Sequence, residues 1–150
     1  MTTPLSHPLF AGLGAEAARA VEALATRVSH PAGTLLLRED EPATRVYLLV
    51  SGDVALEVHA PGAGPTRLET LGPGDVLGLS WLSPPADVHL DARALTPVDA
   101  WCVDAAGLLA LMDRDHDAGY AIARRLLTAT FDRLRRTRLA RLDVFGKRPA

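Results

Sequence analysis

Between residues 31 and 104, glycine and proline recur at short intervals, and this punctuation limits the fold more than any other feature of the sequence. The segments between them are rich in Leu and Val and follow the two-residue period of a strand. Strands are predicted at 34–38, 45–50, 55–59, 66–71, 88–95 and 98–103. Many short strands joined by Gly and Pro turns favour an antiparallel β-roll, or jelly-roll barrel, in a mainly β chain with flanking helices.

The connections between these strands are predicted from their turn residues. Gly52 and Asp53 supply a tight hairpin, and residues 72–75, Gly-Pro-Gly-Asp, form a second sharp turn. The segment 61–65 holds two prolines and two glycines. We therefore expect an exposed loop there that takes no part in strand pairing.

Helical periodicity lies on both sides of the β region. Residues 15–29 place apolar side chains at steps of three and four and predict an amphipathic helix. A short helix is predicted at 105–112 and a long one at 118–143. We therefore expect one domain over residues 1–150, with an N-terminal helical segment at 1–30, the β-roll at 31–104 and C-terminal helices at 105–150.

Composition excludes several classes of protein. The 150 residues are 48% hydrophobic and 23% charged, which is the balance of a folded globular chain. The longest apolar run, 105–112, is far shorter than the roughly 20 residues that span a bilayer, and no secretory signal is recognisable. We therefore expect a cytoplasmic protein without membrane association. The single cysteine, Cys102, excludes an internal disulfide and favours a buried apolar role over a reactive thiol.

Charge is distributed unevenly along the chain. Residues 1–114 hold 7 Arg against 14 Asp and Glu, a net charge of −7, whereas residues 115–150 hold 9 Lys and Arg against 4 Asp, a net charge of +5. A basic C-terminal helix after an acidic body indicates either contact with nucleic-acid phosphates or neutralisation within the molecule. We favour neutralisation, because runs of charge on helices usually face solvent or an oppositely charged neighbour.

The long C-terminal helix carries apolar side chains on more than one face. One face is expected to pack on the chain's own roll. The other, with Leu127, Phe131 and Leu134, is expected to contact a second copy in a homodimer.

Several short motifs follow one another in a fixed order. They are Gly33-Thr34, Glu39-Asp40, the apolar strand 46–50, Ser51-Gly52 and the turn 72–75. This order resembles the first half of a cyclic-nucleotide-binding domain of the Crp/Fnr regulator family, and the resemblance covers nearly the whole chain. It implies a regulatory, ligand-sensing domain in which the roll cradles a ligand and the long helix after it forms a parallel dimer contact.

The resemblance also implies which groups hold a cyclic nucleotide, and here the sequence departs from the family. The family uses a Gly-Glu pair, whose Glu accepts from the ribose 2′-hydroxyl, and an Arg followed by Ser or Thr that binds the phosphate. In this chain Gly78 is followed by Leu79, and counting back from Arg93 places Val88 and His89 at the phosphate positions. Because a buried phosphate without a cation is costly, a cyclic nucleotide is not the favoured ligand or cofactor.

The predicted ligand pocket therefore has a changed character. It comprises Gly78, Leu79, Ser80, Trp81, Val88 and His89. An apolar wall admits a flatter or more apolar small molecule, with Ser80 and His89 as polar contacts. Two other possibilities stay open. Trp81 fills the pocket, or the module binds a protein partner in place of a small molecule. The alternative function is a cyclic-nucleotide (cAMP or cGMP) receptor domain in transcriptional regulation or signalling.

Other activities lack their motifs. The five histidines are scattered without a metal-binding spacing, and neither a Gly-x-Ser-x-Gly nucleophile nor a phosphate-binding glycine loop is present. We expect no enzyme activity, no metal and no cofactor. Only residues 144–150 follow the long helix, so a helix-turn-helix is lacking and this chain alone is not expected to read DNA sequence.

Overall fold

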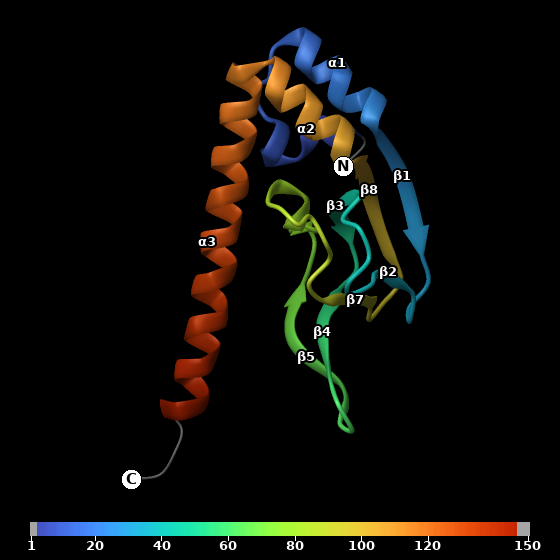
Figure 1. Cartoon of the computed structure of the whole chain (residues 1–150), viewed down its shortest axis with the longest axis vertical. Helices are drawn as coiled ribbons and strands as arrows, with labels where there is room; N and C mark the ends of the chain where they lie inside the picture. Colours follow the sequence, from blue (N-terminus) through green and yellow to red (C-terminus); the bar gives the residue numbers. More distant parts are fainter. Residues whose placement is uncertain (1–2, 147–150) are drawn as a thin grey trace.

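In the computed structural model, which describes residues 3–146, eight strands form two four-stranded antiparallel sheets. One sheet has the order β1-β8-β3-β6 and the other β2-β7-β4-β5 (Figure 1). The strands are β1 (Ala25–His30), β2 (Leu35–Leu37), β3 (Arg45–Ser51), β4 (Val54–Ala60), β5 (Gly64–Leu71), β6 (Val76–Leu77), β7 (Asp91–Ala94) and β8 (Val98–Asp104). The predicted antiparallel β-roll is confirmed.

Strand β3 contributes to two separate hydrophobic cores because alternate side chains leave opposite faces of a strand. Tyr47 and Leu49 pack in the core between the two sheets. Val46 and Leu48 pack in a second core beneath the helices. All four side chains are buried. Strand β3 is therefore hydrophobic almost throughout, in contrast to a strand with one face in solvent.

Helices cover the outer face of the β1-β8-β3-β6 sheet. They are the 3₁₀ helices η1 (Pro4–Ser6) and η2 (Pro8–Phe10), then α1 (Ala15–Leu24), α2 (Ala105–Arg114) and α3 (His116–Gly146). Asp104 caps α2, since its carboxylate accepts the Gly107 N–H at 2.8 Å. Helices α1 and α2 lie together over one end of the roll, and α3 runs along its side (Figure 1).

The predicted helix at 15–29 is wrong over its last five residues. Helix α1 ends at Leu24, and residues 25–30 form β1, which pairs with β8 from Ala25–Val103 to His30–Val98. Thr26 and Val28 are β-branched and suit a strand. Pairing with β8 outweighs the three-and-four spacing of the apolar residues, so the 1–30 segment is not helical throughout.

Two further boundaries differ from the prediction. The loop expected at 61–65 is shorter, because the β4–β5 ladder continues to His59–Pro65 and Ala60–Gly64. Proline is tolerated there since β5 is an edge strand. The strand expected at 88–95 is reduced to β7, and the two-residue strand β6 and a 3₁₀ turn, η3 (Ser80–Leu82), were not predicted.

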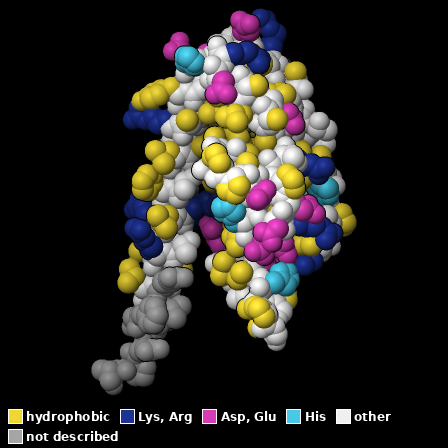
Figure 2. Space-filling view, viewed as in Figure 1, with side chains coloured by type: hydrophobic (Ala, Val, Ile, Leu, Met, Phe, Trp, Pro, Cys, Tyr) yellow, Lys and Arg dark blue, Asp and Glu magenta, His cyan; other side chains and the backbone are white. Residues whose placement is uncertain are grey.

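Helix α3 changes character at its midpoint. Ile122 and Leu126 are buried against the core beneath the helices. Beyond Leu126, the described side chains of α3 include none that is buried. Figure 2 shows a hollow between this half of α3 and the roll. Among the described residues, α3 and the other helices are too short or too polar to cross a membrane.

Candidate functional site

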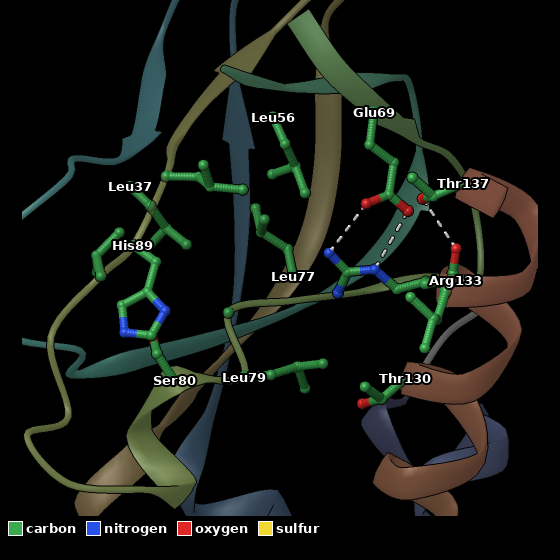
Figure 3. Close-up of a pocket in the computed structure, with 14 residues that line it drawn as sticks. Leu37, Leu56, Glu69, Leu77, Leu79, Ser80, His89, Thr130, Arg133 and Thr137 are labelled. Carbon is green, nitrogen blue, oxygen red and sulfur yellow. Dashed lines mark hydrogen bonds and ion pairs between the residues drawn. The ribbon is translucent and has the colours of Figure 1, made fainter. Parts of the chain in front are cut away.

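A cavity of about 330 Å³ lies between the roll and the second half of α3. Its walls come from β2, β4, β5, β6, the β6–β7 connection and α3 (Figure 3). The lining residues are Leu37, Leu56, Glu69, Leu77, Gly78, Leu79, Ser80, Val88, His89, Leu90, Thr130, Arg133, Leu134 and Thr137. Most of the surface is aliphatic, which is the usual composition of a small-molecule pocket.

The roll side of the cavity is shaped by Gly78. Its φ is +90°, and a Cβ at this position would lie 2.9 Å from the Arg45 carbonyl oxygen. Glycine is therefore required both by the left-handed backbone and by the close approach to β3. The turn that it makes at the end of β6 brings Leu79 and Ser80 to the cavity wall.

Five of the six residues predicted to form a pocket lie together at this cavity, namely Gly78, Leu79, Ser80, Val88 and His89. The sixth, Trp81, does not line it. Trp81 is buried in the core beneath the helices, and its indole Nε1 donates to the Gly78 carbonyl at 2.9 Å. The η3 turn places the side chain of Trp81 behind the wall, so the cavity is not filled by this residue.

The polar end of the cavity was missed by sequence reasoning. Arg133 on α3 and Glu69 on β5 face each other there, with 3.4 Å between the arginine Nε and a carboxylate oxygen (Figure 3). These residues are 64 positions apart, and no local pattern connects them. The helical spacing of Thr130, Arg133 and Thr137, which places polar groups on one face of α3, was the available signal.

The hydroxyl groups on α3 have limited capacity toward a ligand. Thr130 donates to the Leu126 carbonyl at 2.8 Å, and Thr137 donates to the Arg133 carbonyl at 3.0 Å. Their protons are thus used inside the helix, and only acceptor lone pairs remain. Because the charges of Glu69 and Arg133 cancel, the lining carries no net charge when His89 is neutral.

A larger cavity of about 600 Å³ lies where η2 and the 72–75 turn meet α3. Several of its polar groups already have partners within the chain. His7 contacts the Gly74 carbonyl through Nε2 at 2.7 Å, and Arg125 donates to the Leu9 carbonyl at 3.2 Å. Burial lowers the pKa of His7, although the hydrogen bond to Gly74 and the charge of Asp75 partly oppose this shift. These contacts join α3 to the N-terminal segment, and we assign them a structural role.

The arginines at positions 133–138 of α3 divide into two groups. Arg133 pairs with Glu69, and Arg136 pairs with Asp75 at 3.3 Å, so part of the basic helix is neutralised by the acidic roll. Arg135 and Arg138 are exposed. Neutralisation within the molecule therefore accounts for Arg133 and Arg136, the two arginines that pair with the roll.

The possible metal ligands and the single thiol are the other reactive side chains of the described part of the chain. No group of three or more His, Cys, Asp or Glu side chains there is arranged to hold a metal ion. Burial raises the pKa of the Cys102 thiol, which disfavours the nucleophilic thiolate. The Cys102 side chain packs at the edge of the core between the sheets.

Comparisons with known proteins agree with this architecture. The model of the cyclic nucleotide-binding domain family matches residues 27–115. The CRP-like cAMP-activated global transcriptional regulator of Mycobacterium tuberculosis is 30% identical over 130 residues, which are 86% of this chain and 56% of that protein. The chain thus spans about half the length of this relative.

Three solved structures share the fold. A cyclic nucleotide-binding domain from Methylobacillus flagellatus has a TM-score of 0.75 at 20% identity and covers 97% of this chain and 80% of that one. The N-terminal domain of a transcriptional regulator from Streptomyces coelicolor gives 0.65 at 28% identity, covering 91% and 92%. The Thermus thermophilus catabolite activator protein gives 0.67 at 27% identity, covering 93% and 63%.

Proposed function

Because the chain belongs to the cyclic nucleotide-binding domain family, we propose that it is a non-catalytic sensor module whose ligand binds in the cavity between the roll and α3. The observation that carries this proposal is the meeting of five sequence-predicted residues with α3 around one cavity. A ligand there touches both the rigid roll and the less tightly packed half of the helix. Binding is thereby coupled to the position of α3.

The chemistry of the cavity supports a ligand other than a cyclic nucleotide. Leu79 and Val88 line the wall where the family pattern places its ribose and phosphate contacts. A phosphodiester bound there faces aliphatic side chains, and burying its charge without a donor is unfavourable. Arg133, the one arginine of the lining, belongs to α3 and not to the wall that Leu79 and Val88 form.

The second candidate, a cyclic-nucleotide receptor with altered contacts, is favoured by one observation. The relative from Mycobacterium tuberculosis is a cAMP-activated regulator. Calorimetric titration with cyclic AMP and cyclic GMP separates the two candidates, since only a receptor produces saturable heat at stoichiometric concentrations.

Restoring the family groups tests the assigned wall directly. The double change Leu79→Glu with Val88→Arg supplies a ribose acceptor and a phosphate cation, and we expect it to increase affinity for cyclic AMP about tenfold or more. The matched control is Leu82→Arg, which adds a charge at an exposed position outside the cavity. No gain in a folded double variant would contradict the placement of the ligand against this wall.

We further propose that the module is a homodimer through α3. Leu127, Phe131 and Leu134 are exposed by 41–56%, at spacings of four and three residues that place them on one face. Leu134 also lines the cavity. A ligand that contacts Leu134 therefore reaches a side chain of the proposed dimer face.

A further inference from the structure

The two residues of the ion pair at the polar end of the cavity differ in how many hydrogen-bonding partners hold them. Arg133 is held twice, because its Nη1 also donates to the Val76 carbonyl at 3.3 Å. The carboxylate of Glu69 has Arg133 as its one hydrogen-bonding partner among the described residues. The guanidinium therefore stays in place when the carboxylate leaves, whereas the carboxylate loses its partner when the guanidinium leaves.

The geometry of the pair leaves room for a closer carboxylate. The Nε–Oε1 distance is 3.4 Å and the Nη2–Oε2 distance is 3.5 Å, both longer than the roughly 2.7–2.9 Å of a good charged hydrogen bond. Two nitrogens face two oxygens, which is the arrangement of a bidentate arginine–carboxylate pair. The attachment of Glu69 to β5 and of Arg133 to α3 sets their separation, and a free carboxylate is not bound by that constraint.

Glu69 has an alternative position when it is displaced. It lies on β5, the edge strand of its sheet, and its side chain is already 20% exposed to solvent. Rotation of its side chain returns the carboxylate to water, where it is well solvated. Exchange of this carboxylate for another therefore leaves no buried unpaired charge.

The remainder of the cavity is suited to an apolar body. Beyond Arg133 and Glu69, the roll lines the cavity with the aliphatic side chains of Leu37, Leu56 and Leu77 (Figure 3). The volume of about 330 Å³ is at the lower end of the roughly 300–1,000 Å³ found for ligand pockets. Size and lining together limit the ligand to a compact molecule with few polar groups away from Arg133.

We propose that the ligand is a small monocarboxylic acid with an apolar body, and that its carboxylate replaces Glu69 on Arg133. This inference rests on the proposed function and adds the chemical class of the ligand. Glu69 occupies the position of the ligand's carboxylate when the cavity is free, and Arg133 is the residue that determines specificity. Because Arg133 is on α3, the acid binds the movable helix directly instead of binding through the roll alone.

Calorimetry on the full chain tests the assignment with matched ligands. Hexanoate, octanoate and phenylacetate are titrated beside their primary amides, which keep the shape and lose the negative charge. We expect at least one acid to bind and to exceed its own amide in affinity by about tenfold or more. Equal affinity for acid and amide, or no binding by any of the acids, overturns the proposal.

Variants of the pair give effects of opposite sign. Arg133→Gln is expected to weaken acid binding about tenfold or more and to remove the preference for acid over amide. Glu69→Gln is expected to strengthen acid binding severalfold, because the competing carboxylate is gone, and misfolding does not produce such a gain. Arg136→Gln is the matched control, since Arg136 pairs with Asp75 and does not line this cavity. An Arg133→Gln variant that keeps the acid preference overturns the proposal.

Thermal-shift screening separates this inference from the proposed function. Stabilisation of the chain by uncharged small molecules alone overturns the carboxylate assignment and leaves the sensor function standing. If no compound of a broad metabolite library, the acids included, stabilises the chain, the result counts against both the carboxylate assignment and the sensor function. Stabilisation by acids that Leu37→Trp abolishes supports both, because Leu37 is half-buried and lines the cavity on the side away from the ion pair (Figure 3).

Discussion

Individual residues set the turns of the roll, and Gly52 is the position where backbone freedom is needed most. Its φ is +89°, and a Cβ there would collide with the Pro97 carbonyl oxygen and approach Val98. Gly62 has a similar φ of +79°, yet a Cβ at that position would meet no atom within 4 Å. The two glycines therefore separate the cost of the left-handed conformation from the cost of crowding.

We predict that Gly52→Ala lowers the free energy of unfolding by about 2 kcal/mol or more, because both costs apply. Gly62→Ala should lose about 1 kcal/mol, because only the left-handed conformation is penalised. Urea unfolding of the two variants and the unaltered chain measures the difference. Equal losses for both would show that the approach to Pro97 contributes nothing.

His7 links the N-terminal segment to the 72–75 turn in its neutral form. Its Nδ1 accepts the Leu9 N–H at 3.1 Å, so the proton of the neutral ring belongs on Nε2, facing the Gly74 carbonyl. Protonation of Nδ1 removes this acceptor. Burial, the largest contribution, lowers the pKa of His7 in the folded protein.

The folded pKa of His7 lies below its unfolded value of about 6.5, so the unfolded chain takes up the proton first as the pH falls. We predict that this contribution to stability is complete above pH 6.5 and declines with falling pH until the folded pKa is reached. Urea midpoints across this range should fall more steeply for the unaltered chain than for His7→Asn. Parallel pH profiles would contradict the assignment.

At the residue scale, the roll side of the cavity was predictable and its polar end was not. Gly78, Leu79 and Val88 were found because the order of motifs fixes their place relative to Arg93. Glu69 and Arg133 meet only through the packing of α3 on the roll, and a local pattern cannot report that packing. Trp81 was misplaced because the sequence did not reveal the η3 turn.

Among the elements, α3 differs most between its two halves. The first half is fixed by Ile122 and Leu126, whereas the second reaches the roll through the Arg133 and Arg136 contacts over a cavity. Helices with few buried contacts open readily, which suits an element that responds to a ligand. The proposed dimer face lies on this second half.

We predict that amide exchange in residues 127–140 slows as the protein concentration rises, because dimer formation buries Leu127 and Phe131. Leu127→Asp should leave exchange fast at every concentration and give a monomer by sedimentation at tens of micromolar. Leu109→Asp, on an exposed position of α2, is the matched control and should behave like the unaltered chain. A dimer that survives Leu127→Asp would remove α3 from the interface.

Element boundaries followed from the sequence where local chemistry determines them. The β3 strand was predicted because a short apolar run bounded by turn residues is a local signal. The tight hairpin predicted at Gly52 is wrong: the chain turns there, but β3 and β4 lie in different sheets and do not pair with each other. The change from α1 to β1 at Ala25 was not predicted, because apolar residues at 15–29 fit a helix equally well. Only pairing with β8, more than 70 residues later, decides between the two.

In the whole molecule, the roll and the long helix of this cyclic nucleotide-binding domain enclose a cavity whose lining is mostly aliphatic. The acidic body and basic helix predicted from charge counting meet at two ion pairs beside this cavity. In the proposed sensor, the ligand binds where these two charged parts of the chain meet, and its specificity depends on the exchange of its carboxylate for that of Glu69.

Calorimetric titration of the full chain with cyclic AMP tests the central claim, that the cavity lacks the side chains with which the family binds the ribose and phosphate of a cyclic nucleotide. We predict no saturable heat at concentrations where the Leu79→Glu, Val88→Arg double variant gives a one-to-one binding curve. Tight one-to-one uptake of cyclic AMP by the unaltered chain would contradict it.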